Sequence, residues 1–273
     1  MTPEHRGKAL SWAKRENILE VNLHQPPCNE IGTQMLADLK ALTVQLEQTP
    51  SDIRVLLLYS GLESGFCAGA DLRELHAELV HRNQRGIAKQ QSAQELRDFL
   101  DSIHDVFNAL DRLPLVTIAA VHGPVFGGGL ELALVCDLIV ADATARFCFP
   151  ELRLGLVPGF GGIPRLKRDV GNSIIRDLLF TGRSLNARRA HEVGLVSQRV
   201  SHGEALSAAR ALAKQVSQFD RSTVAVAKPF AKPTLSVELE KEKDLFCELF
   251  LSPRVEEALA HFLTRTDLRA YLP

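Results

Sequence analysis

Two short apolar segments constrain the fold of this chain more than any other feature. The segments "RVLLLYSG" (54–61) and "LVTIAAVHG" (115–123) each end at a glycine and carry few polar side chains. Such strands are buried on both faces, as in a parallel sheet that is covered by helices. Helical periodicity over about 30–48 and over 99–113 separates them from each other and from the preceding strand at 17–23. This alternation up to about residue 200 predicts an α/β fold.

The last third of the chain has a different character. From about residue 203 the sequence predicts almost only helices, over 203–217, 221–230, 236–251 and 253–265. The charged run "ELEKEKD" (238–244) predicts a solvated helix face. We therefore divide the chain into a core that carries the active site, residues 1–200, and a helical C-terminal region, residues 201–273. That region either covers the core or forms contacts between subunits.

Several further segments yield local predictions. The apolar run "LIVADATARFCF" (138–149) is strand-like, and the glycine triplet before "LELALVCD" predicts the start of a buried helix. The polar stretch 76–97 predicts a helix with a solvated connection. "NARRAHEVGLV" predicts a helix that is capped by Asn186.

Charge and cysteine content exclude some classes of protein. The 273 residues carry a net charge of −1, which provides no basic surface for nucleic acid or an anionic membrane. The five cysteines form no CxxC pair and predict free buried thiols in a reducing compartment. The N-terminal sequence lacks the apolar core of a signal peptide, and no apolar run has the length of a membrane span. We therefore expect a soluble, cytoplasmic protein.

Three glycine-containing turns follow strand-like segments: "FCAGADL" (66–72), "FGGGLEL" (126–132) and "LVPGFGG" (156–162). Glycine leaves peptide N–H groups unshielded, and the first N–H groups of a helix have no partner within it. Two such N–H groups from two turns can bind an oxygen that becomes negative during a reaction, as in an oxyanion hole. The alternative is that these small residues only allow a helix to pack closely on the sheet. The spacing GxGxxG is absent, which disfavours a dinucleotide site.

Two glutamates stand beside these turns in apolar company. Glu131 lies in the first turn of the helix after the triplet, and Glu151 follows a proline in "FCFPELRLGLVPG". A buried carboxylate must be paired, hydrogen-bonded or protonated, and two of them near glycine turns are typical of general acid–base chemistry. Glu131 as a structural helix cap is the alternative. A GxSxG serine hydrolase motif and a metal-ligand spacing are both absent.

Three long segments carry a resemblance to a known family. "FCAGADLREL", "AAVHGPVFGGGLELALVCDLIVADATARFCFPELRLGLVPGFGGIPRL" and "TGRSLNARRAHEVGLVSQRV" resemble the crotonase family, the enoyl-CoA hydratase/isomerase proteins. The resemblance implies a spiral of ββα units with a helical C-terminal region that forms trimers, which pair into hexamers. It also implies an acyl-CoA thioester substrate, in which coenzyme A is part of the substrate, and no metal or redox cofactor.

The same resemblance implies roles for single residues. The backbone N–H groups of Ala68 and Gly128 match the family's oxyanion hole, which holds the thioester oxygen while an enolate forms. Glu131 and Glu151 match the two catalytic glutamates of the hydratases. The expected substrate-binding residues are Ala70, Asp71, Leu72, Arg73, Gly127, Pro158 and Gly159.

Because the chain retains both glutamates, the resemblance favours reversible addition of water to the 2,3 double bond of an enoyl-CoA. The alternatives are an enoyl-CoA isomerase and the hydrolysis or cleavage of a β-oxo or aromatic acyl-CoA. Some family members bind RNA, but the near-neutral charge disfavours that function.

Overall fold

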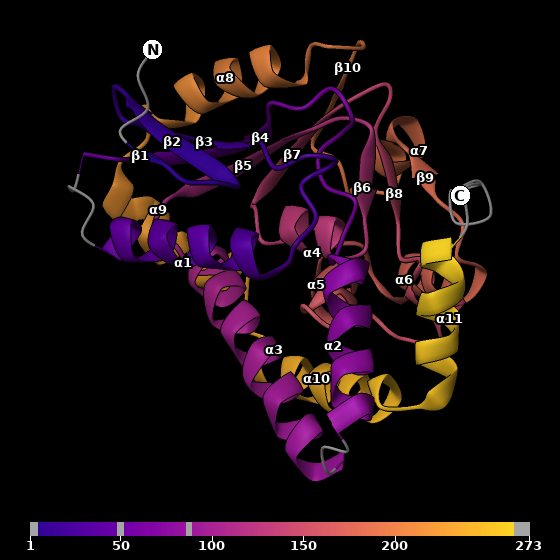
Figure 1. Cartoon of the computed structure of the whole chain (residues 1–273). Coiled ribbons are helices and arrows are strands. Elements are labelled where there is room, and N and C mark those ends of the chain that lie inside the picture. The colour runs from indigo at the N-terminus through magenta and orange to yellow at the C-terminus, as the bar shows by residue number, and fades with distance from the viewer. Residues whose placement is uncertain (1–4, 48–51, 86–88, 265–273) are drawn as a thin grey trace.

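The computed structural model describes residues 5–47, 52–85 and 89–264 and is built on a central seven-stranded sheet (Figure 1). The strand order is β1-β2-β3-β4-β5-β7-β10. Strands β1 to β3 pair antiparallel, and β3 to β10 pair parallel. The strands are β1 (His5–Arg6), β2 (Leu10–Arg15), β3 (Ile18–Leu23), β4 (Val55–Ser60), β5 (Val116–Val121), β7 (Leu138–Asp142) and β10 (Gln198–Val200). The predicted α/β fold class is confirmed.

The two apolar strands β4 and β5 lie in the parallel part of this sheet and are covered on both faces. Helix α8 (Ala205–Val216) lies across one face, where its alanines pack on side chains of β4, β5 and β7 (Figure 1). On the other face, α1 (Thr33–Glu47) and α3 (Lys89–Asp111) contribute to the larger hydrophobic core. The first helix of the C-terminal region is therefore one of the layers around the sheet.

A second, three-stranded sheet has the order β6-β8-β9, with strands β6 (Pro124–Phe126), β8 (Arg146–Cys148) and β9 (Leu185–Asn186). The strand-like segment 138–149 is thus divided between the two sheets. Asp142 explains the break, because its carboxylate accepts hydrogen bonds from the N–H and the hydroxyl of Thr144, at 2.8 and 2.6 Å, and closes a turn.

Nine further helices complete the described part of the fold. They are α2 (Leu72–Arg85), α4 (Gly128–Leu134), the 3-10 helix η1 (Glu151–Leu154), α5 (Gly162–Val170), α6 (Asn172–Thr181), α7 (Ala187–Glu192), α9 (Arg221–Ala231), α10 (Ser236–Phe250) and α11 (Pro253–Thr264). Helices α10 and α11 pack against α3 and α5 and against α2 and η1, respectively (Figure 1). The C-terminal region therefore contributes to the surroundings of the glycine turns.

Most predicted helices match the structure to within three residues at each end. The predicted cap of α7 is confirmed, because the Asn186 side chain accepts the N–H of Arg189 at 2.9 Å. Helix α3 begins at Lys89, ten residues before the predicted start at 99, so part of the polar stretch 76–97 belongs to it. Residues 86–88 of that stretch lie outside the described residues.

The five cysteines are free thiols, as predicted, and all except Cys247 are buried. None of the helices within the described residues combines the length and the apolar character that a membrane crossing requires.

Candidate active site

The three glycines between β6 and α4 are each required by a different neighbour. A Cβ on Gly129 would lie 2.3 Å from the Cys67 carbonyl oxygen, so this glycine allows close packing of two backbones. A Cβ on Gly127, whose φ is 47°, would lie 2.3 Å from Oε1 of Glu151. A Cβ on Gly128 would lie 2.9 Å from the ring of Phe160. The packing explanation therefore applies to Gly129, whereas Gly127 and Gly128 face the predicted active site.

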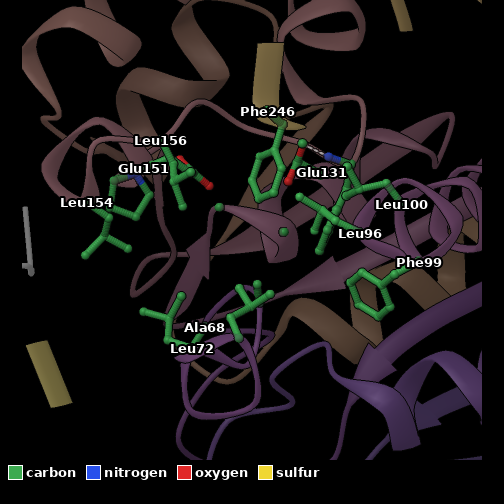
Figure 2. Close-up of a pocket in the computed structure, with 18 residues that line it drawn as sticks. Ala68, Leu72, Leu96, Phe99, Leu100, Glu131, Glu151, Leu154, Leu156 and Phe246 are labelled. Carbon is green, nitrogen blue, oxygen red and sulfur yellow. Dashed lines mark hydrogen bonds between the residues drawn. The ribbon is translucent and has the colours of Figure 1, made fainter. Parts of the chain in front are cut away.

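Gly127 and Gly128 line a cavity of about 70 Å³, and so do both predicted glutamates (Figure 2). Glu131 and Glu151 are the ionisable side chains in its lining. The apolar side chains of the lining are Ala68, Ala70, Leu72, Leu75, Leu96, Phe99, Leu100, Pro150, Leu154, Leu156, Phe160 and Phe246. The fold thus brings together two carboxyl groups that are twenty residues apart, in surroundings that contain few other polar groups.

Glu131 is held by a segment distant from its own helix. Its side chain is 2% exposed, and Oε1 accepts the N–H groups of Phe160 and Gly162, each at 2.8 Å. These donors lie at the start of α5, so Glu131 is not a cap of its own helix α4. Burial raises the pKa of Glu131 to about 7, even though the two N–H bonds and Arg165 favour the ionised form. Near neutral pH this carboxyl group therefore exchanges a proton readily.

Glu151 is the first residue of the short helix η1, and fewer hydrogen bonds offset the effect of burial on its carboxyl group. Its Oε2 is buried and has no hydrogen-bond partner within residues 5–47, 52–85 and 89–264. Burial, followed by repulsion from Glu131, raises the pKa of Glu151 well above its usual range. Burial and the neighbouring Glu131 charge therefore favour the protonated form of Glu151. Two carboxyl groups whose environments separate their pKa values are the arrangement expected of an acid and a base.

Only one of the two predicted oxyanion donors is available. Gly128 is the first residue of α4, so its N–H has no partner inside the helix. The N–H of Ala68, in contrast, donates to the Cys28 carbonyl at 2.9 Å. The assignment of Ala68 is therefore wrong, because this N–H is already used to hold the turn.

Ala70 offers the second N–H in place of Ala68. The two residues beside it bond to Ile31. The Gly69 carbonyl accepts the Ile31 N–H at 2.7 Å, and the Asp71 N–H donates to the Ile31 carbonyl at 3.0 Å. The intervening N–H of Ala70 has no partner in the described part of the chain, and its nitrogen would lie 3.3 Å from a Cβ on Gly128. The N–H groups of Ala70 and Gly128 thus lie on neighbouring parts of the cavity wall.

The other predicted substrate-binding residues divide into two groups. Ala70, Leu72, Gly127 and Gly159 line the cavity, whereas Asp71, Arg73 and Pro158 do not. Asp71 instead accepts the N–H groups of Arg73 and Glu74 at 2.9 and 3.2 Å and so caps the start of α2.

A further buried carboxyl group near these glutamates, that of Glu242, was not predicted from the sequence. The charged run 238–244 is not a uniformly solvated face, because Glu242 and Lys243 are 3% and 4% exposed. Their spacing from Leu239 and Phe246, which are also buried, places them on the inner side of α10. This helical spacing was the available signal, and the number of charges in the run obscured it. In the described residues, no group of three or more His, Cys, Asp or Glu side chains is arranged to hold a metal ion.

The sequence and the fold both match proteins named enoyl-CoA hydratases. The model of the enoyl-CoA hydratase/isomerase family matches residues 13–269. A probable enoyl-CoA hydratase of Mycobacterium leprae is 34% identical over 259 residues, which cover 92% of this chain and 93% of that protein. A probable mitochondrial enoyl-CoA hydratase of Arabidopsis thaliana is 37% identical over 212 residues, 77% of this chain and 66% of the plant protein. The crystal structure of an enoyl-CoA hydratase from Bacillus halodurans covers 93% of this chain and 99% of its own, with a TM-score of 0.81 and 22% identity.

Proposed function

Because this chain belongs to the enoyl-CoA hydratase/isomerase family, whose members are enzymes of the crotonase type, we propose that it adds water reversibly to the 2,3 double bond of an enoyl-CoA thioester. The observation that carries this proposal is the pair of carboxyl groups at one apolar cavity, Glu131 with a pKa raised to about 7 and Glu151 with a pKa raised well above its usual range. Hydration needs a group that accepts a proton from water and a group that donates one to carbon.

Glu131 is the proposed base. Its Oε1 is fixed by the Phe160 and Gly162 N–H groups, so Oε2 is left to accept a proton from water. The water oxygen then forms a bond to C3 of the substrate, and the electrons of the double bond move toward the thioester carbonyl. The charge that develops on that oxygen is stabilised by the N–H groups of Gly128 and Ala70, at about 10²–10³-fold in rate for each donor.

Glu151 is the proposed acid. It donates its proton to C2 as the enolate collapses, which completes the addition of one hydrogen and one hydroxyl group across the double bond. Transfer of the proton from Glu131 to Glu151 then restores the starting state. The buried, unpartnered Oε2 of Glu151 is consistent with this role, because such an atom is satisfied only when water or substrate enters the cavity.

The surroundings of the cavity favour an apolar acyl group. A larger groove of about 580 Å³ adjoins it and shares Ala70, Leu75, Leu96 and Phe99 with its lining. The groove runs between side chains of α2 and α3, and its far part is lined by charged side chains such as Glu74, Glu78 and Arg82. The apolar side chains that it shares with the cavity let an acyl chain that exceeds the cavity extend into its near part. We therefore propose that the enzyme accepts straight acyl chains longer than four carbons.

The proposal is tested by following the absorbance of the conjugated double bond in 2-enoyl-CoA substrates of increasing chain length. We expect the absorbance to fall at a rate proportional to the enzyme concentration. The product should be heavier than the substrate by the mass of one water molecule. No turnover of short, long, branched or aromatic 2-enoyl-CoA thioesters contradicts the proposal.

Isomerisation of an enoyl-CoA is the second candidate. It needs a single carboxyl group, which in its ionised form removes a proton from C2 and then returns that proton to C4 as the double bond moves. Glu151 has an unpartnered oxygen at the cavity and is the candidate for this group. A 3-enoyl-CoA substrate distinguishes the two reactions, because isomerisation creates the conjugated absorbance that hydration removes. Full isomerase activity in Glu131→Gln favours the second candidate.

We further propose a homotrimer or a hexamer built from two trimers, the absence of a cofactor, and a cytoplasmic location. The oligomeric state is accessible to size-exclusion chromatography with light scattering, and activity after exhaustive treatment with a chelator tests the second prediction.

A further inference from the structure

The C-terminal helix α10 carries a carboxyl group that bonds to the same loop as Glu131. Glu242 is buried, and its Oε1 accepts the Gly161 N–H at 2.6 Å while its Oε2 accepts the Ile163 N–H at 2.8 Å. Both donors belong to the loop at the start of α5. The side chain is not in the lining of the cavity, so it does not reach the substrate directly.

Four consecutive N–H groups are thus shared alternately between two glutamates. Phe160 and Gly162 donate to Glu131, whereas Gly161 and Ile163 donate to Glu242. Gly161 has a φ of 99°, a left-handed conformation in which successive peptide groups can point in different directions. The direction of the N–H groups that hold Glu131 therefore depends on the groups that Glu242 holds.

The carbonyl side of this loop is fixed independently. Arg165 is fully buried and donates from Nη1 to the carbonyls of Phe160 and Gly161 at 2.9 and 3.3 Å. It is itself anchored to α3 by Asp111, at 3.1 Å. On the N–H side, Glu131 and Glu242 are the bonded partners, and loss of Glu242 leaves two buried N–H groups without an acceptor. Such groups reorient or admit water, because an unsatisfied buried donor is costly.

We propose that Glu242 is a positioning residue for catalysis, which holds residues 160–163 so that their remaining N–H groups orient Glu131, and which thereby connects helix α10 to the active site. The catalytic part of this inference rests on the proposed function. The structural part, in which Glu242 orders residues 160–163, does not.

The charges around Glu242 give this role a pH signature. The groups that face it are Glu131 from α4, Glu151 from η1 and Arg165 from α5. Burial and then the Glu131 charge raise the pKa of Glu242, while two N–H bonds and Arg165 lower it. Glu242 in turn raises the pKa of Glu151. At any pH where Glu242 is ionised, an uncharged residue at position 242 therefore removes a repulsion and lowers the pKa of Glu151.

The test compares Glu242→Gln with Glu238→Gln, which makes the same change at an exposed position one turn earlier in α10. The amide retains the volume of Glu242 but accepts only one of the two N–H groups. We expect kcat to fall about 10–100-fold with KM little changed, because misplacement of a catalytic group has effects of this size. We also expect the alkaline limb of the kcat profile to move to lower pH. Glu238→Gln should match the wild type in all three measurements.

Hydrogen exchange provides a measurement that needs no substrate. In Glu242→Gln, peptides that cover 160–163 should exchange faster, while peptides of β4 and β5 keep their protection. If the wild type has no hydratase activity, this local change still supports the positioning of the loop, and only the proposed function fails. Unchanged exchange at 160–163, or faster exchange throughout the chain, contradicts the positioning role.

The variant Glu242→Asp distinguishes the effect of the negative charge from the effect of side-chain length. It also tests the proposal if Glu242→Gln does not fold. Aspartate keeps the negative charge but is one methylene shorter, so it cannot hold both N–H groups in the same geometry. We expect Glu242→Asp to have a reduced kcat, while the alkaline limb of its kcat profile stays at the wild-type pH. A wild-type kcat in both variants contradicts the proposal.

Discussion

The two glutamates line the same cavity, yet their surroundings differ. Glu131 lies on a regular helix, and two N–H groups fix one of its oxygens. Glu151 begins a single turn of 3-10 helix, and its Oε2 has no bonded partner among the described residues. Burial raises the pKa of both groups, but only Glu131 has N–H bonds from another segment to compensate. This difference in hydrogen bonding is the reason why we propose Glu131 as the base and Glu151 as the acid.

Replacing Glu151, the glutamate with fewer hydrogen bonds, should have the largest effect on the reaction rate. In Glu151→Gln the amide cannot give a proton to carbon, so we expect kcat/KM to fall about 10³–10⁴-fold, the upper part of the range for general acid–base catalysis. Steady-state hydration of a 2-enoyl-CoA measures this loss. The thermal midpoint should stay at the wild-type value or rise, and a large fall in the midpoint would show that Glu151 is instead a structural residue.

Replacing Glu131, which two N–H groups hold, should have a smaller effect on the reaction rate. The carbonyl oxygen of Glu131→Gln can still accept the Phe160 and Gly162 N–H groups, so the loop keeps its place while the base is lost. We expect kcat to fall about 10²–10³-fold. The limb near pH 7 in the wild-type profile should disappear, and its persistence in the variant would assign that limb to another group.

Two glycines with left-handed conformations test how closely Glu151 depends on its neighbours. Gly127 and Gly155 have φ values of 47° and 75°, so alanine is strained at both. A Cβ would lie 2.3 Å from Glu151 Oε1 at Gly127, but 3.6 Å from its nearest contact at Gly155. Gly127→Ala should therefore lower kcat about 10–100-fold through displacement of Glu151, whereas Gly155→Ala costs only about 1 kcal/mol of stability. Equal kcat in the two variants would show that displacement of Glu151 by the Gly127→Ala side chain does not affect the reaction.

The last expected effect concerns stability as a function of pH and does not involve the reaction rate. The folded-state pKa of Glu131 is about 7, against a reference value of 4.5, so the folded state binds more protons between these values. The free energy of unfolding therefore falls as pH rises from about 4.5 to 7, by on the order of 3 kcal/mol for this group. Denaturant unfolding of the wild type and Glu131→Gln at pH 5 and pH 8 measures it. The variant should lose less stability between these pH values, and equal losses would show that Glu131 is not the group responsible.

Local sequence patterns predicted much of the fold for identifiable reasons. Uninterrupted apolar runs identified β4 and β5, and the Asn186 cap located the start of α7, because these signals depend on neighbouring residues only. The division of 138–149 between two sheets was missed, since apolar content alone does not show which sheet a strand joins. The burial of Glu242 was missed for a related reason. A charge-rich helix keeps its polar appearance even where one of its carboxylates finds buried N–H donors.

The sequence by itself determined the α/β fold class, the family resemblance and the two glutamates, because these depend on periodicity and on continuous motifs. Only the tertiary structure decided which groups are free to act. Ala68 and Ala70 are both in the motif "CAGAD", and the hydrogen bond from Ala68 to Cys28 excludes the first and leaves the second. Glu131 and Glu242 are far apart in the chain but share one loop. Hydrogen bonds between distant segments make these distinctions, and no local pattern of residues records them.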